Sequence, residues 1–303
     1  MNILMTGGTG LIGQAFIRQF DDHQFTVLSR SKPNKANASS ALPATVNLID
    51  SLDRLHNLDD FDAVINLAGE PIIDKRWSPK QKHIICQSRW LLTQQLVDLF
   101  ANSQTPPSVF LNGSAIGAYG DRGDQIVTEA SPVEVTDFPT KLCLKWEEIA
   151  MGAAPYTRVV LLRTGIVLAA HGGALGKMLL PFKCCLGGRI GDGRQFMSWI
   201  HYQDHLNAMQ FALLESSISG AVNLVAPEAQ RNSVFTQALA KSLNRVAVVP
   251  LPKKILQLLL GESSCLLLDS QRIAPQKLLQ NGFEFKFQSV KLAFDNLLKS
   301  PSV

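Results

Sequence analysis

The chain has 303 residues, of which 46% are hydrophobic and 18% are charged, enough to bury one large α/β core or a core with a small second lobe. Its 29 basic and 25 acidic side chains leave a formal charge of +4, which is too even for a nucleic-acid-binding protein. The odd count of five cysteines, with no C-x-x-C pair, argues against a disulfide framework.

The first predicted element is a short apolar strand over residues 2–6, which breaks on glycines and restarts as a helix. Gly7, Gly10 and Gly13 have the spacing G-x-x-G-x-x-G. At such a turn a Cβ atom would obstruct a pyrophosphate, and the helix that follows points unpaired N–H groups and its positive dipole end at the phosphates. The strand, the turn and the helix together predict a dinucleotide site.

The second predicted strand, over residues 25–29, indicates which dinucleotide is bound. NAD enzymes place an acidic residue near its end to take the ribose 2′-hydroxyl, but this chain has no Asp or Glu between Asp22 and Asp50. It has Ser29 and Arg30 there instead, and a guanidinium can pair with a 2′-phosphate. The sequence therefore favours NADP(H), unless Arg30 is only a solvated charge at a strand end.

Further strands and helices alternate along the chain. Strand-like runs at residues 46–49, 63–67, 109–112 and 158–163 are separated by amphipathic segments such as 89–101 and 141–151. This alternation implies right-handed crossovers, and we predict an α/β fold with a Rossmann-type doubly wound parallel sheet and a small C-terminal substrate-side lobe. The NADP(H)-binding domain is placed at residues 1–245, with substrate-side excursions after 165, and the mostly helical lobe at residues 246–303.

The run at residues 63–67 ends in Ala68 and Gly69, whose small size would let the backbone approach the ribose and phosphates of a cofactor. A plain tight turn is the alternative. Arg89, on the helix that follows, could reach the phosphates or lie at the surface.

The strand at residues 109–112 leads into Ser114 and Tyr119, the candidate catalytic groups. In this architecture the end of that strand lies beside the nicotinamide, where a hydroxyl can take part in hydride chemistry. In the alternative interpretation, Ser114 only ends the strand and Tyr119 packs its ring.

Several motifs together resemble a known family. They are the glycine loop at 6–13, residues 66–72, residues 76–77, 88–89 and 114–120, residues 137–138 and 146–147, residues 163–167 and 191–201, and a tail with Leu251-Pro252, Gly261-Glu262 and Gly282-Phe283. They look like the extended, epimerase-type branch of the short-chain dehydrogenase/reductases. More narrowly, they resemble an atypical family of NAD-dependent epimerase/dehydratase-like proteins, some of which have been labelled cell-division inhibitors.

The resemblance spans nearly the whole chain and implies an NADP(H) site together with the C-terminal domain of that family. The implied cofactor-binding residues are Gly7, Thr9, Gly10, Leu11, Ile12, Ser29, Arg30, Leu67, Ala68, Arg89 and Val167.

One departure from the family pattern concerns the catalytic residues. Short-chain dehydrogenases use Tyr-x-x-x-Lys, in which the lysine lowers the pKa of the tyrosine so that it can exchange a proton. The matching segment at residues 137–147 has no tyrosine: Asp137 takes its position if Lys141 is the lysine, and Lys141 takes it if Lys145 is. Any acid must come from elsewhere, and Tyr119 is the nearest phenol, with Asp121, Lys141 and His201 as weaker candidates.

The substrate side of the resemblance contains polar and aromatic candidates. Gln195, Ser198, Trp199 and His201 could line a substrate pocket, although Trp199 could equally be core and His201 a hydrogen-bonded structural residue. No cluster of His, Cys, Asp or Glu has metal-ligand spacing, so we expect no metal.

Two functions fit the sequence. One is an NADP(H)-dependent oxidoreductase or nucleotide-sugar epimerase acting on a small polar substrate. The other is a non-catalytic NADP(H)-sensing protein that acts through a protein partner. A cofactor alternative, an ordinary NAD enzyme, would require coenzyme binding that does not weaken when Arg30 becomes Ala. We expect no nucleic acid and no membrane as partners, a monomer or weak homodimer, and a cytoplasmic location, since no apolar stretch is long enough to span a membrane and the chain begins directly with the first strand.

Overall fold

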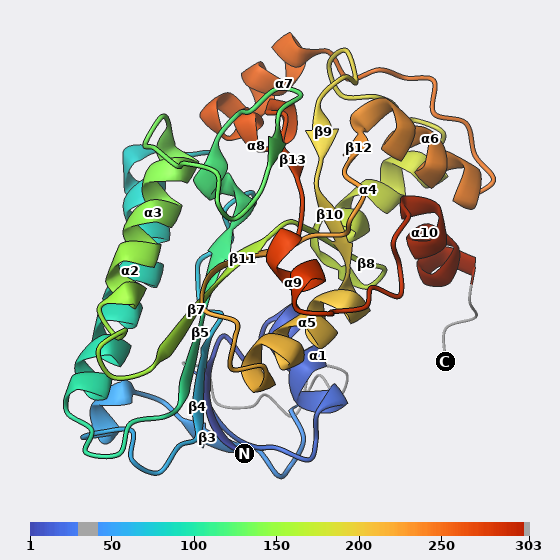
Figure 1. Ribbon diagram of the computed structural model, residues 1–303. Coiled ribbons are helices and arrows are strands. Elements are labelled where there is room, and N and C mark those ends of the chain that lie inside the picture. The colour runs from blue at the N-terminus through green and yellow to red at the C-terminus, as the bar shows by residue number, and fades with distance from the viewer. Residues whose placement is uncertain (30–41, 300–303) are drawn as a thin grey trace.

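The computed structural model describes residues 1–29 and 42–299. Its centre is a seven-stranded parallel sheet with the order β11-β7-β5-β4-β1-β2-β3 (Figure 1). The strands are β1 (Asn2–Thr6), β2 (Gln24–Leu28), β3 (Asn47–Ile49), β4 (Ala63–Asn66), β5 (Val109–Ala115), β7 (Arg158–Thr164) and β11 (Gly220–Leu224). Because the chain builds outward from β1 in both directions, the predicted Rossmann-type α/β fold is confirmed.

Helices cover both faces of the sheet. Helices α1 (Leu11–Gln19) and α5 (Tyr202–Leu214) cover one face, and α2 (Pro79–Ala101) and α3 (Phe138–Met151) cover the other (Figure 1). Because successive strand residues point to opposite faces, one strand contributes to both hydrophobic clusters.

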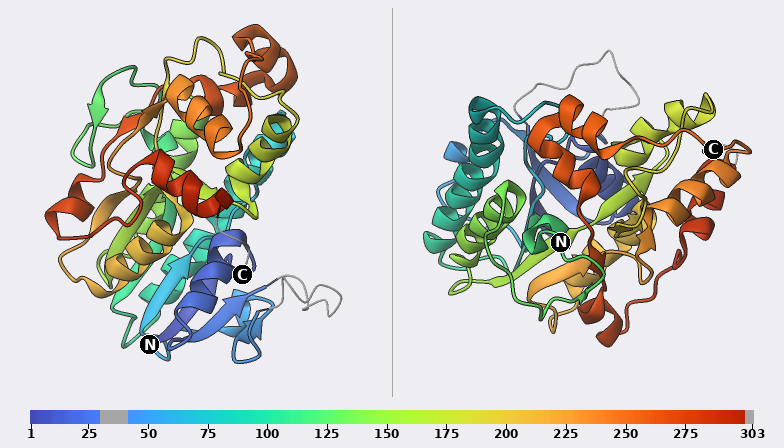
Figure 2. Two further views of the ribbon diagram at one scale, coloured as in Figure 1. Left: turned by 90° about the vertical axis from the view of Figure 1, so that its right-hand side faces the viewer. Right: turned by 90° about the horizontal axis from the view of Figure 1, so that it is seen from above.

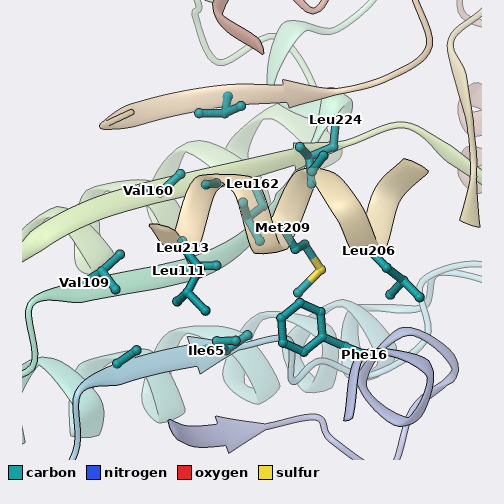
Figure 3. Packing of buried hydrophobic residues seen from close by; sticks show 14 of the residues in the cluster. Phe16, Ile65, Val109, Leu111, Val160, Leu162, Leu206, Met209, Leu213 and Leu224 are labelled. Carbon is teal, nitrogen blue, oxygen red and sulfur yellow. The ribbon is translucent and has the colours of Figure 1, made fainter. Parts of the chain in front are cut away.

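In β5, for example, Val109 and Leu111 pack in the cluster under α1 and α5, whereas Phe110 packs in the cluster under α2 and α3. Figure 3 shows Met209 and Leu213 of α5 lying against the strands of the first cluster.

Two helices begin well before their predicted first residues, and local capping explains the difference. Helix α2 begins at Pro79 rather than Arg89, because the Ser78 hydroxyl accepts a hydrogen bond from the Gln81 amide. Helix α3 begins at Phe138 rather than Lys141, because the Asp137 carboxylate caps it.

The elements after β7 gather mainly above the carboxyl ends of the strands and beside the β11 edge of the sheet (Figures 1 and 2). The remaining helices are α4 (Gly173–Lys183), α6 (Asn232–Ser242), α7 (Lys253–Leu260), α8 (Cys265–Leu268), α9 (Gln276–Gln280) and α10 (Val290–Lys299), with short 3-10 turns at Leu52–Arg54, Ile116–Tyr119 and Gly261–Ser264. The short strands form three pairs: β8 (Ile166–Ala169) with β10 (Trp199–His201), β9 (Phe196–Met197) with β12 (Gln230–Arg231), and β6 (Ile126–Val127) with β13 (Arg272–Ile273).

The C-terminal residues join the main core at two places. Phe283 and Phe285 are buried in the cluster that holds α1 and α5 on the sheet, and Phe294 of α10 packs edge to face on Phe235 of α6. The boundary at residues 245 and 246 stays a prediction. Among the helices in the described part of the chain, none is both long and apolar enough to cross a membrane.

Candidate functional site

The turn between β1 and α1 has the geometry of an anion site. Gly7 has φ +73°, and a Cβ atom there would lie 2.6 Å from the carbonyl carbon of Leu67, so only glycine fits between the ends of β1 and β4. Gly10 is the N-cap of α1 and supplies no capping side chain. The first N–H groups of α1 therefore face outward with the positive end of the helix dipole, which suits a phosphate.

Neighbouring candidate residues surround this turn. Leu11 is 42% exposed, and its side chain lies 3.4–3.5 Å from where Cβ atoms of Gly172 and Gly173 would be, at the start of α4. The carbonyl oxygen of Val167 lies 3.7 Å from the same position at Gly173. The loop before α4 thus adjoins the glycine turn.

Thr9, Ile12 and Ser29 are also predicted cofactor residues, and each has a contact within the protein. The Thr9 carbonyl accepts a hydrogen bond from the Gln14 side chain, and Ile12 packs on the core under α1. Ser29, at the end of β2, donates its backbone N–H to the Ile49 carbonyl. Arg30 lies outside the described residues.

Arg89 lies over the end of β4. Its Nη1 atom donates to the carbonyl oxygens of Glu70 and Ile85, at 3.1 and 3.2 Å, and its guanidinium lies 5.3 Å from the centre of the Trp146 ring. A Cβ atom at Gly69 would come within 2.6 Å of Arg89 Cζ, so the glycine makes room for the guanidinium.

Burial lowers the pKa of Arg89. Among the residues that the structure describes, no carboxylate forms an ion pair with it. Arg89 is partly buried, and although Glu70 attracts its charge, it forms no ion pair within this part of the chain, so its guanidinium fits an anionic ligand such as a phosphate.

A buried polar network joins the carboxyl ends of the central strands. Thr6 Oγ1 donates to Asn66 Oδ1 at 2.5 Å, and Asn66 Nδ2 donates to Asn112 Oδ1 at 2.7 Å and to Thr93 Oγ1 at 2.9 Å. The Trp146 indole N–H donates to the same Thr93 hydroxyl at 2.8 Å. These bonds tie β1, β4 and β5 to α2 and α3 beside the glycine turn.

A second buried network contains the candidate catalytic serine. Ser114 Oγ donates to Glu147 Oε1 at 2.6 Å, and Arg163 donates to both oxygens of Glu147 at 2.8 and 2.7 Å. All three residues are less than 9% exposed. Burial opposes the charge of Arg163, but hydrogen bonds and attraction from Glu147 raise its pKa above the ordinary value.

Tyr119 belongs to the same network. Its hydroxyl donates to Asn223 Oδ1 on β11 at 2.7 Å, and the Arg163 guanidinium lies 4.7 Å from the centre of its ring. Burial raises the pKa of the phenol. Since β5 and β7 separate β11 from β4 and β1 in the sheet, the phenol hydroxyl points away from the glycine turn.

The helix that should carry Tyr-x-x-x-Lys presents other residues to the sheet. Lys141 and Lys145 are exposed, and Lys145 pairs with Glu148 at the surface. The inward positions hold Cys143 and Glu147, and burial raises the pKa of the Cys143 thiol to about 12. Neither alignment of the motif therefore places a lysine at the strand ends.

The four candidate substrate residues are all buried and hydrogen-bonded within the protein. Gln195 Nε2 donates to the carbonyls of Ile190 and Leu267, Ser198 Oγ donates to that of Gln271, the Trp199 indole donates to that of Glu228, and His201 Nε2 lies 3.1 Å from Asn296 Oδ1. His201 also stacks on Phe287 at 3.7 Å and caps α5 through its Nδ1 atom. The structure therefore gives each of them a structural contact, and their partners lie in different segments of the chain.

The sequence reasoning gave no role to the residues that bind Ser114 and Tyr119. Glu147, Arg163 and Asn223 were named only within resembling motifs or not at all. The sequence does contain one indication of this network, which is that Arg163 follows the apolar run 159–162. A charge at the end of a buried strand needs a buried partner. Within the described residues, no group of three or more His, Cys, Asp or Glu side chains could hold a metal ion.

The chain is similar to a known family and to several known proteins. Residues 3–224 match the NAD dependent epimerase/dehydratase family, and residues 251–297 match a domain of unknown function, DUF1731. Epimerase family protein SH2119 of Staphylococcus haemolyticus is 36% identical over 299 residues, which cover 97% of this chain and 98% of that protein.

Two solved structures are also similar. The human epimerase family protein SDR39U1 (isoform 2), crystallised with NADPH, has a TM-score of 0.91 and 32% identity, covering 99% of this chain and 100% of that one. A nucleoside-diphosphate sugar epimerase from Corynebacterium glutamicum has a TM-score of 0.76 and 30% identity, covering 98% of this chain and 58% of that one.

The buried ion pair leads to a stability prediction. Glu147→Gln leaves the Arg163 guanidinium buried without a counter-charge, so we expect a loss of about 3–5 kcal/mol in the free energy of unfolding, measured with urea. The control is Glu148→Gln on the same helix, which removes an exposed ion pair and should cost less than about 1 kcal/mol. Equal effects of the two variants would contradict the assigned role of Glu147.

A second prediction concerns pH. Burial lowers the pKa of both His201 and His205 to about 4, against about 6.5 in an unfolded chain. Between these values the unfolded chain binds more protons than the folded one. The stability is therefore complete above pH 6.5 and falls as the pH drops toward 4, by up to about 1.4 kcal/mol per pH unit for each histidine.

The test is urea unfolding at several pH values across that window. His205→Gln should make the pH dependence shallower, whereas His83→Gln at an exposed position should leave it unchanged. An identical slope for wild type and His205→Gln would show that His205 is not neutral in the fold.

Proposed function

Because the chain belongs to the NAD dependent epimerase/dehydratase family, we propose that it binds NADP(H) at the turn between β1 and α1 and acts as an oxidoreductase or nucleotide-sugar epimerase on a small polar substrate. The observation that carries the proposal is the Gly7 turn against Leu67, followed by a helix N-terminus with no capping side chain. This turn lies at the carboxyl end of β1. The sheet grows from β1 to β2 on one side and from β1 to β4 on the other, so the order of the strands reverses direction at this point. Ligands of doubly wound sheets bind at that point.

The chain supplies groups for each part of the cofactor. The backbone N–H groups of Leu11 and Ile12 and the Arg89 guanidinium suit the diphosphate. Leu67, Ala68 and Gly69 line the adjoining end of β4, and Val167 lies across the turn. When bound, the nicotinamide supplies hydride transfer.

The preference for NADP(H) over NAD(H) is part of the proposal. It is supported by the absence of Asp and Glu between residues 22 and 50, by Ser29 and Arg30 in the sequence after residue 28, and by the human relative crystallised with NADPH. The family description names NAD, so a binding measurement must decide.

We expect calorimetry to show tighter binding of NADPH than of NADH, and Arg30→Ala to weaken NADPH binding about 10–100-fold, the effect of a lost charge-assisted hydrogen bond. NADH binding should change little. Arg54→Ala, which removes an exposed arginine paired with Asp50, is the control. If both coenzymes bind wild type and Arg30→Ala alike, the NADP(H) preference is wrong; if neither binds wild type, the cofactor site is wrong.

Ser114 is the side chain best placed for chemistry on a substrate. It lies two residues beyond Asn112, which is in register with Asn66 and through it with Thr6. It therefore stands about 6–7 Å above the end of β1. Because the Ser114 hydroxyl donates its hydrogen bond to Glu147, the lone pairs of its oxygen can accept a hydrogen bond from a substrate hydroxyl.

A second candidate function is NADP(H) sensing without turnover. It is favoured by one observation, which is that the lysines of the Tyr-x-x-x-Lys segment are exposed and the hydroxyl of Tyr119 is bonded to Asn223. The two functions differ when the protein is mixed with NADPH and a panel of sugar nucleotides and carbonyl compounds. Loss of nicotinamide absorbance or a product by mass spectrometry supports catalysis, provided that Ser114→Ala reduces it. Tight NADPH binding without turnover on any compound favours the sensor.

A further inference from the structure

Two segments that lie side by side combine exposed apolar residues with basic ones. Residues 174–191 contain most of α4 and the loop after it, and residues 245–260 contain the loop before α7 and α7 itself. Backbone hydrogen bonds from Val249 N to Gly187 O and from Leu251 N to Arg189 O join the two segments. Neither segment contains an aspartate or glutamate.

The most exposed large hydrophobic side chains of the described residues are all in these segments. They are Leu258 (75% exposed), Leu180 (71%), Val248 (70%), Leu186 (65%) and Leu259 (63%), which we call the apolar patch. Val249 and Ile255 extend it and are 45% and 46% exposed. Single exposed hydrophobic residues are ordinary, but a group of this kind marks an interaction surface.

The same two segments carry five further basic residues: Lys183, Arg189, Arg245, Lys253 and Lys254. Within the described part of the chain, none of the five forms an ion pair. Lys177, farther along α4, pairs with Asp74. The two segments therefore combine exposed apolar side chains with five cations that form no ion pair among the described residues, although Glu262 and Asp269 lie near Lys253.

We propose that the apolar patch docks on the surface of an anionic phospholipid bilayer. An apolar helix face next to lysines and arginines is the composition of interfacial membrane-binding helices, because leucines enter the acyl boundary while the cations meet the lipid phosphates. Protein interfaces are typically enriched in aromatic residues and depleted of lysine. The apolar patch has no aromatic residue, and three of the five basic residues named above are lysines, which favours a bilayer over a protein partner.

The place of the patch orients the docked molecule. Helix α4 starts against Leu11 of the glycine turn, and α7 lies above the carboxyl ends of the strands (Figures 1 and 2). Docking would therefore turn the proposed cofactor side of the protein toward the bilayer. The proposal goes beyond the proposed function and does not depend on it. It differs from the expectation of no membrane partner, which considered only spanning segments.

The test is flotation of the full chain with two kinds of vesicle, phosphatidylcholine alone and phosphatidylcholine mixed with phosphatidylglycerol. We expect binding to the mixed vesicles only, and release by high salt. Lys253→Gln with Lys254→Gln should weaken binding by about fivefold for each charge removed. Leu258→Gln with Leu259→Gln should abolish it. The matched control is Leu91→Gln with Leu214→Gln, which replaces leucines that are 60% and 61% exposed outside the patch.

Circular dichroism checks that each variant is folded. Failure of wild type to float with either vesicle, or equal flotation of the Leu258/Leu259 variant and its control, would overturn the proposal. If light scattering instead shows a dimer that only the Leu258/Leu259 variant dissociates, the patch is an interface between copies of the chain and the bilayer proposal is wrong.

Discussion

The ion pair between Glu147 and Arg163 is the interaction on which the arrangement at the strand ends depends. Arg163 lies near the end of β7 and Glu147 lies on α3, so their two hydrogen bonds fix the rotation of the helix against the sheet. Ser114 donates to the same carboxylate and Tyr119 packs its ring on the same guanidinium. Because every partner is buried, the loss of one leaves the others with unsatisfied polar atoms in a low-dielectric interior.

The second network, from Thr6 through Asn66 to Asn112, does the same for the central strands. The strands are otherwise apolar on both faces, as expected for a parallel sheet covered by helices. Polar side chains are concentrated at the carboxyl ends, where the chain leaves the sheet. The two networks tie these strand ends to one another and to α2 and α3, and support of this kind keeps a site in one geometry.

The two halves of the candidate site differ in character. The glycine turn presents backbone N–H groups with no capping side chain, and Arg89 forms no ion pair among the described residues, which supports the proposal that an anion binds in this half. The half proposed for substrate has its polar side chains engaged with the protein itself, from Ser114 to His201. The two halves therefore differ in whether their polar groups already have partners within the protein.

The sequence by itself determined the features that depend on residues close together in the chain. Short apolar runs between amphipathic segments predicted the strands, the glycine spacing predicted the turn, and the lack of a Tyr-x-x-x-Lys segment could be read directly. The starts of α2 and α3 were misplaced because Ser78 and Asp137 act as caps outside the amphipathic pattern. Only the tertiary structure decided that Tyr119 meets Asn223, 104 residues away, and that Arg163 meets Glu147. Such pairs depend on strand register and helix rotation, which are set by packing of the whole core and leave no spacing in the sequence.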